Sequence, residues 1–288
     1  MSQLKDLLNS VSQSDFELEE VRKVSHRGPY DLVELGRSRL LVVIGDSWTY
    51  GWRLNEEFAE NPDQERVTHS YGYLLAEHYN ADYLNWSIPA INNLWMVNKY
   101  RTLVDLADQL AYDEIFVFIT LTEYGREIYT EFDADPELND MYRQCTQPKD
   151  LAKVLSTYLS DKLLKHSHPK IRLRLGINYV NNLYSAELAE KFLDQTWIEC
   201  LTGQQFTDEC LVVGSWVVEK YNLLSKEINT AADAIQCKEQ VLGMVDSAQQ
   251  RLNMIFGSPY NHKTGYGHPN TKGHQIWADY LIQNRVFG

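Results

Sequence analysis

The stretch LLVVIGDSWTYGW, residues 40–52, decides the fold prediction. Residues 40–44 are apolar at every position, which is typical of a strand buried on both faces in a parallel sheet covered by helices. Whatever follows such a strand emerges at the carboxyl edge of the sheet, where open α/β folds bind their ligands. We therefore expect Asp46, Ser47 and the aromatic residues after them to lie at a functional edge.

Strand-like and helix-like segments alternate along the rest of the chain. Strands are predicted at 40–44, 83–86, 114–121 and 171–180, and helices at 71–79, within 92–111, and at 151–164 and 275–287. This order implies right-handed crossovers and a parallel sheet, and so an α/β/α sandwich. Residues 1–38 are polar and charged and are interpreted as an N-terminal extension. Residues 39–288 are interpreted as one domain, with 182–255 as a helical elaboration of it.

Composition bounds the classes of protein to consider. The 288 residues are 44% hydrophobic, which is ample for one large packed domain. The formal net charge of −13 argues against general affinity for nucleic acid or anionic membranes, because its long-range field repels both. The four cysteines show no spacing typical of zinc sites, and no signal peptide or membrane-spanning run is evident. We expect free thiols and a cytoplasmic protein.

Two polar residues are candidates for nucleophilic chemistry. Ser47 lies in a turn opened by Gly45, so its hydroxyl is a potential nucleophile if a base removes its proton. The alternative is that Asp46 and Ser47 only cap a helix or stabilise a turn. His268, held before Pro269 and an amphipathic helix, is the candidate base, because catalytic groups are assembled in space and not in sequence. Its alternative role is helix capping, and His274 is expected to pack or lie on the helix surface.

Taken together, these motifs resemble the SGNH (GDSL-type) hydrolase superfamily. GDS at 45–47 is similar to the first block of that family, and HPNTKGH at 268–274 to its closing block. NWSIPAINN at 85–93 resembles the second block, with Ala90 where the family usually has glycine. The resemblance runs from about residue 40 to 285 in the family's order.

The resemblance implies a fold, an activity and a set of roles. The fold would be a three-layer α/β/α sandwich whose parallel sheet has a flavodoxin-like strand order. The activity would be hydrolysis of an O-acyl or O-acetyl ester of a carbohydrate or small molecule, with Ser47 as nucleophile and His268 as base. Asp46 would be a structural or orienting residue, and the N–H groups of Ser47 and Ala90 would stabilise the oxyanion. No metal or organic cofactor is implied.

The third block departs from the family pattern. In place of G-x-N-D, the strand at 114–121 runs into TEYGRE, residues 122–127. Thr122 is the best substitute for the asparagine, because a hydroxyl donates one hydrogen bond. Alternatively, Arg126 supplies a cationic donor or binds an acidic substrate group, or it pairs at the surface with Glu123 or Glu127. A T-x-x-x-R spacing is similar to that of phage-encoded members of the superfamily.

The orienting acid is the other departure. Gly265 stands where the family places aspartate, three residues before His268. His268 is then oriented by a carbonyl, a tyrosine or a carboxylate such as Asp46, Glu123 or Glu127, or it works with Ser47 as a dyad.

Two further readings stay open in the sequence. Trp48 and Trp52 are candidates for substrate contact, although most aromatic side chains pack in the core. Acyl transfer uses the same acyl-enzyme as hydrolysis, and a catalytically inactive binding or structural protein on the same scaffold is the rival from another class.

Overall fold

The computed structural model describes residues 4–8, 30–89, 91, 93–122, 148–178, 188, 190–202 and 268–288. Of the helical elaboration predicted at 182–255, only residues 188 and 190–202 are among them. The predictions for Ala90, Arg126 and Gly265 concern residues outside the described ones, as do the alternatives Glu123 and Glu127.

Within the described residues, the sheet has five strands in the order β1-β3-β2-β4-β5. They are β1 (Asp31–Val33), β2 (Arg39–Gly45), β3 (Asp82–Asn85), β4 (Glu114–Leu121) and β5 (Ile171–Ile177). Only β1 runs antiparallel to its neighbour, and the four parallel strands follow the flavodoxin-like order that was predicted. The chain passes from β2 to β3 on one side and then to β4 on the other. The direction of winding therefore reverses at β2, whose carboxyl end is the switch point where such folds bind ligands.

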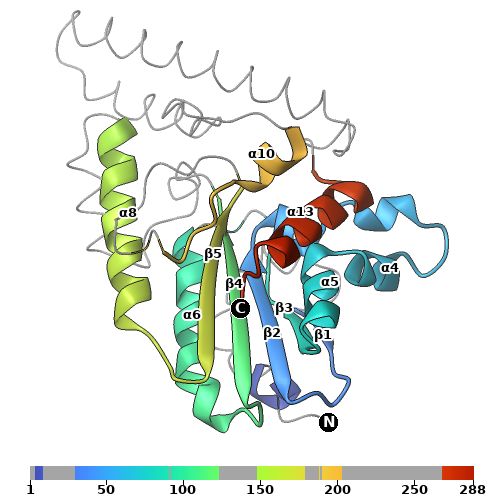
Figure 1. The fold of residues 1–288 in the computed structure, drawn as a ribbon, viewed down its shortest axis with the longest axis horizontal. Coiled ribbons are helices and arrows are strands. Elements are labelled where there is room, and N and C mark those ends of the chain that lie inside the picture. Colours follow the sequence, from blue (N-terminus) through green and yellow to red (C-terminus); the bar gives the residue numbers. More distant parts are fainter. Residues whose placement is uncertain are drawn as a thin grey trace, which may run out of the picture.

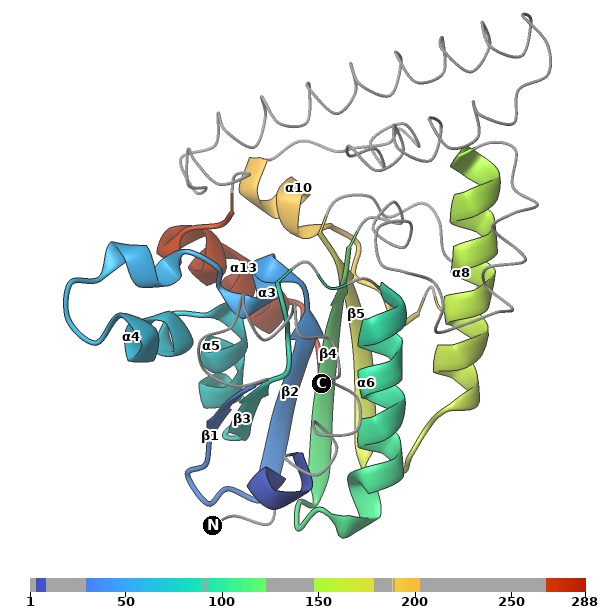
Figure 2. The same ribbon diagram turned by 180° about the vertical axis from the view of Figure 1, so that it is seen from behind.

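Helices cover both faces of this sheet, as Figures 1 and 2 show from opposite sides. In β2, Leu40, Val42 and Ile44 belong to the core cluster that includes residues of α6 and α8, whereas Leu41 and Val43 belong to the cluster with α5, α10 and α13. Residues 40–44 are apolar at every position because alternate side chains pack into the two layers of helices, which confirms the three-layer prediction. The helices are α3 (Ser47–Tyr50), α4 (Pro62–Thr68), α5 (Tyr71–His78), α6 (Asn93–Leu106), α8 (Pro148–Lys165), α10 (Trp197–Thr202) and α13 (Thr271–Gln283), with short 3₁₀ turns η1 (Leu54–Glu57) and η2 (Ala107–Gln109).

Helix α13 begins four residues earlier than its apolar pattern predicted. The side chain of Asn270 caps it by accepting a hydrogen bond from the Gly273 N–H at 2.9 Å. The first turn is therefore set by the cap and not by hydrophobic periodicity.

The stretch interpreted as an N-terminal extension contributes to this domain. Strand β1 pairs with β3 at the edge of the sheet, and the buried side chains of Leu4 and Leu8 join the core on the α6 side. A strand of three residues has too few positions to show a period of two, so the pattern did not predict it.

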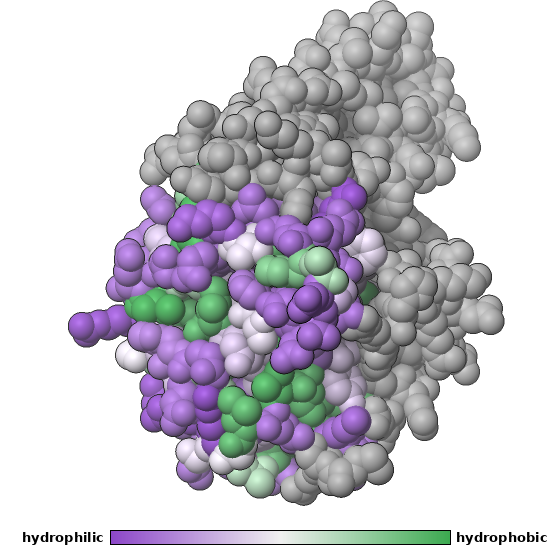
Figure 3. Space-filling model, turned by 90° about the vertical axis from the view of Figure 1, so that its right-hand side faces the viewer, coloured by the Kyte–Doolittle hydropathy of each residue, from purple (hydrophilic) through white to green (hydrophobic). Residues whose placement is uncertain are grey.

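The described part of the face shown in Figure 3 is mostly hydrophilic. In the face shown in Figure 3, apolar side chains form separate patches among polar ones. Leu35 and Leu164 are the exposed large hydrophobic residues of the described part. None of the described helices is long and apolar enough to cross a membrane.

Candidate active site

The segment from Gly45 to Trp52, here called the Ser47 turn, leaves the carboxyl end of β2 as a single helical turn. Asp46 caps this turn, because its Oδ1 accepts a hydrogen bond from the Trp48 N–H at 2.9 Å. Gly51 ends it with a φ of 77°, a left-handed conformation that favours glycine, and the Trp52 N–H donates to the Ser47 carbonyl at 2.9 Å. Ser47 is thereby held as the first helical residue after the strand.

Gly45 is required by the packing of this turn. A Cβ atom at Gly45 would lie 2.1 Å from Oγ1 of Thr49, far inside contact distance. The glycine of the GDS motif therefore lets the chain fold back sharply enough to bring Ser47 over the end of β2.

His268 meets Ser47 across the length of the chain. Its Nε2 lies 2.9 Å from the Ser47 Oγ, although 221 positions separate the two residues. Both are buried, with exposed fractions of 8% for Ser47 and 7% for His268. A serine hydroxyl within hydrogen-bond reach of an imidazole nitrogen is the geometry of a nucleophile and its general base.

The segment around His268 is fastened at two further points. The N–H and hydroxyl of Thr271 both donate to the Glu57 carboxylate, the shortest contacts being 3.1 and 2.7 Å. His274 is fully buried, where its Nδ1 accepts a hydrogen bond from the Tyr71 N–H at 3.2 Å and its ring stacks on that of Tyr71. The closing motif therefore positions His268 through a helix cap, a carboxylate and a core histidine.

Asn178 was not among the residues predicted for the site. It follows β5 directly, and its Nδ2 donates a hydrogen bond to Oδ1 of Asp46 at 3.1 Å. Both side chains are fully buried. The sequence prediction placed Asn178 inside the strand at 171–180, whereas β5 ends at Ile177. The backbone N–H of Asn178 donates to the carbonyl of Leu121 at 3.0 Å.

Thr122 lies at the carboxyl end of β4, and its backbone is held by a side chain from α6. Oδ1 of Asn93 accepts from the Thr122 N–H at 2.8 Å, and Nδ2 of Asn93 donates to the Thr122 carbonyl at 3.0 Å. Because the N–H of Thr122 is engaged in this way, any oxyanion donor from this residue would be its hydroxyl.

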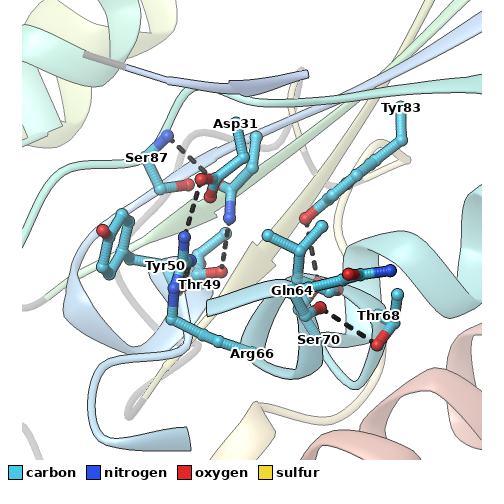
Figure 4. A network of polar contacts seen from close by, with 11 residues as sticks. Asp31, Thr49, Tyr50, Gln64, Arg66, Thr68, Ser70, Tyr83 and Ser87 are labelled. Atoms are coloured by element: carbon cyan, nitrogen blue, oxygen red, sulfur yellow. Dashed lines mark hydrogen bonds and ion pairs between the residues drawn. The ribbon is translucent and has the colours of Figure 1, made fainter. Parts of the chain in front are cut away.

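The back of the Ser47 turn is held by a buried cation, shown in Figure 4. Nη1 of Arg66 donates to the Tyr50 carbonyl at 2.7 Å, its Nη2 pairs with Oδ1 of Asp31 at 2.6 Å, and its guanidinium lies over the Tyr50 ring. Burial opposes the charge of Arg66, but the hydrogen bond and ion pair with Asp31 outweigh it, and the pKa of Arg66 is raised. Asn85 adds a hydrogen bond from its Nδ2 to the Thr49 carbonyl at 3.4 Å.

The two tryptophans predicted to contact substrate lie in different environments. Trp48 is only 1% exposed and packs edge-on against Trp197, at 5.4 Å between ring centroids, so it is a core residue rather than part of a contact surface. Trp52 is half-buried beside the ring of Tyr50, at 6.3 Å. Only Trp52 therefore stays available as an aromatic contact. Within the described ranges, no group of three or more His, Cys, Asp or Glu side chains is arranged to hold a metal ion.

Comparisons with known proteins give distant structural neighbours only. No family model matches the chain, and no curated protein matches it. Among solved structures, a protein described as lipolytic, of the G-D-S-L family, from Desulfitobacterium hafniense has a TM-score of 0.37 at 11% identity, with 86% of this chain and 99% of that one covered. A family two carbohydrate esterase from Clostridium thermocellum, in complex with cellohexaose, has a TM-score of 0.35 at 14% identity, covering 87% and 65%. Phospholipase A1 from Streptomyces albidoflavus has a TM-score of 0.30 at 13% identity, covering 85% and 98%. The functional argument therefore rests on the residues of this chain.

Proposed function

We propose that this chain is a serine-dependent ester hydrolase of the SGNH type, with Ser47 as nucleophile and His268 as general base. The observation that carries the proposal is the 2.9 Å contact between Nε2 of His268 and Oγ of Ser47. It brings together the two sequence motifs that resemble the first and last blocks of the superfamily, at the switch point of the sheet.

The proposed chemistry follows from these groups. His268 takes the proton of Ser47 while Oγ attacks the ester carbonyl carbon, and the carbonyl oxygen becomes an oxyanion. Three donors would stabilise that oxyanion: the N–H of Ser47, the Thr122 hydroxyl and the N–H of Ala90. The N–H of Ser47 is suited to this because N–H groups in the first turn of a helix have no intrahelical acceptor. His268 then gives its proton to the leaving alcohol. Water cleaves the acyl-enzyme by the reverse sequence and restores the Ser47 hydroxyl.

For the substrate we propose an O-acyl or O-acetyl ester of a carbohydrate or small molecule. The support is the motif resemblance together with the half-buried Trp52. Its backbone N–H donates to the Ser47 carbonyl at 2.9 Å, and its ring lies beside that of Tyr50. Acyl transfer to a hydroxyl acceptor is the second candidate. It is favoured by the low exposure of Ser47 and His268, 8% and 7%, which restricts access of water.

The test is intact-mass spectrometry after treatment with a small fluorophosphonate. Wild-type protein should gain one label, and Ser47→Ala and His268→Ala should gain none. Ser160→Ala and His78→Ala are matched controls outside the site and should label like wild type. Folded wild-type protein that stays unlabelled would contradict the proposal and favour a binding protein. A label that persists in Ser47→Ala would contradict it by placing the reactive group elsewhere.

The two reactions are separated by product analysis. With p-nitrophenyl acetate as acyl donor, a hydrolase should release acetate at a rate that added alcohols do not change. A transferase should instead form the acetylated alcohol in proportion to the alcohol supplied.

A further inference from the structure

Asn178 follows β5, and its side chain contacts the Ser47 turn, which follows β2, although β5 and β2 are not neighbours in the sheet. In the strand order, β5 is separated from β2 by β4. The backbone of Asn178 is anchored on the end of β4 by the hydrogen bond to Leu121, and its Nδ2 extends to Oδ1 of Asp46 at 3.1 Å. One residue, through its backbone N–H and its side-chain amide, therefore links the carboxyl ends of β5, β4 and β2.

Asp46 needs such a donor. Its carboxylate is fully buried, and its Oδ1 already accepts the Trp48 N–H that caps α3. A buried carboxylate is tolerated when hydrogen-bond donors replace its lost hydration. The donor from Asn178 arrives at the same oxygen that forms the cap, so it acts on the atom that fixes the orientation of the turn.

We infer that Asn178 is a positioning residue for the nucleophile: it holds the Asp46 carboxylate in place as the cap of α3 and thereby keeps Ser47 in register with His268. It acts through Asp46 and touches neither Ser47 nor substrate. The effect on reaction rate rests on the proposed function, whereas the effect on stability does not.

The titratable groups around Asp46 in the described part of the chain are Tyr71, His268 and His274. Burial raises the pKa of Tyr71 above its usual range. The hydrogen bonds that its hydroxyl shares with Thr120 and donates to Thr49 oppose the rise and the charge of Asp46 adds to it, so the phenol stays neutral. His268 is reached through Ser47, and His274 stacks on the Tyr71 ring. A new carboxylate at position 178 would therefore lie against the carboxylate of Asp46, and none of these groups is a permanent cation.

The variant Asn178→Asp tests this arrangement. Two carboxylates in contact share one proton, so one pKa of the pair is raised above the unfolded value of about 3.9. A carboxyl whose folded pKa is raised contributes stability below the unfolded pKa and loses it as the pH rises through the folded value. Relative to wild type, the melting temperature of Asn178→Asp should therefore fall as the pH rises from about 4 to 8.

The labelling rate should report the same ionisation. In wild type the rate with the fluorophosphonate should rise as His268 loses its proton and then level off. In Asn178→Asp the rate should rise and then fall again, and should be about 10- to 100-fold below wild type on the alkaline side, the loss expected for a hydrogen bond to a charged group. Asn178→Ala should be slow at every pH with the wild-type profile.

Asn80→Asp is the matched control, because it adds the same charge at an exposed turn residue. It should keep the wild-type pH profile in both measurements. If Asn178→Asp behaved like Asn80→Asp in both, the inference would be overturned. If wild type did not label at all, the proposed function would fail, and the melting temperatures of the two variants against pH would still decide the role of Asn178.

Discussion

Thr122 is the residue that we propose in place of the asparagine of the superfamily that this chain resembles. Its backbone N–H and carbonyl are both bonded to the Asn93 side chain, at 2.8 and 3.0 Å. The smaller residue is therefore fixed by its main chain, and a change in its side chain need not displace the strand end. The side chain of Thr122 can therefore be substituted without loss of the backbone hydrogen bonds to Asn93.

Thr122→Val should lower kcat for p-nitrophenyl acetate by about 10²-fold with little change in KM. The isosteric valine removes the proposed oxyanion donor, which acts mainly in the transition state. Thr122→Ser should retain most of the rate, because it keeps the hydroxyl. A wild-type kcat in Thr122→Val would assign the oxyanion contact to other groups.

At this scale the sequence predicted the residues that belong to motifs. Ser47 and His268 were identified because each lies in a short pattern with a known chemical use. Asn178, Asn93 and Arg66 were missed, since each is a single polar residue whose role depends on a partner far away in the sequence. Such contacts carry no local periodicity, and only the folded chain brings the partners together.

The Ser47 turn contains only the four helical residues of α3, which make too few internal hydrogen bonds to be stable alone. It is held in front by Asn178 through Asp46 and behind by Arg66 through the Tyr50 carbonyl. Its conformation is therefore imposed by neighbouring elements, namely β5 and α4.

Arg66→Met should destabilise the fold by about 3–5 kcal/mol, because it leaves the Asp31 carboxylate with no cation in a buried site. The double variant Arg66→Met/Asp31→Asn should recover part of that loss, since neither charge is then buried. Urea unfolding measures both. Lys165→Met, which removes an exposed pair with Asp161, is the control and should change stability by less than about 0.5 kcal/mol. Equal costs for the double and the single variant would contradict this account.

Elements with strong patterns were predicted well. The strand at 114–121 was predicted with the bounds that the structure has, because residues 115–121 form an apolar run that is interrupted only by Thr120. Strand β1 and the start of α13 were not, because a short edge strand is set by pairing with β3 and a helix start by its cap.

On the scale of the whole molecule, residues near the start of the chain stabilise a sheet whose strands lie far along it. Leu4 and Leu8 are buried in the core cluster that also contains residues of β2, β4 and α6. The polar composition of residues 1–38 led to their interpretation as an extension, and the helical spacing of Leu4, Leu7 and Leu8 alone did not show that they pack on the sheet domain.

Leu8→Ala should lower the free energy of unfolding by about 2–5 kcal/mol, because it opens a cavity at a side chain that is 1% exposed. Leu35→Ala is the matched control: its side chain is 53% exposed, and the change should stay within about 0.5 kcal/mol. Both are measured by urea unfolding. If Leu8→Ala lowered the free energy of unfolding no more than Leu35→Ala does, the N-terminal residues would not unfold cooperatively with the core.

The 221 positions between Ser47 and His268 also determine how long after Ser47 the ribosome adds His268. A ribosome that adds about 5–20 residues per second makes Ser47 roughly 10–45 s before His268. During that interval the nascent chain carries the serine without its imidazole. The hydroxyl gains its partner only when the last helix has been made and docked, so under the proposed mechanism an incomplete polypeptide has no activated serine.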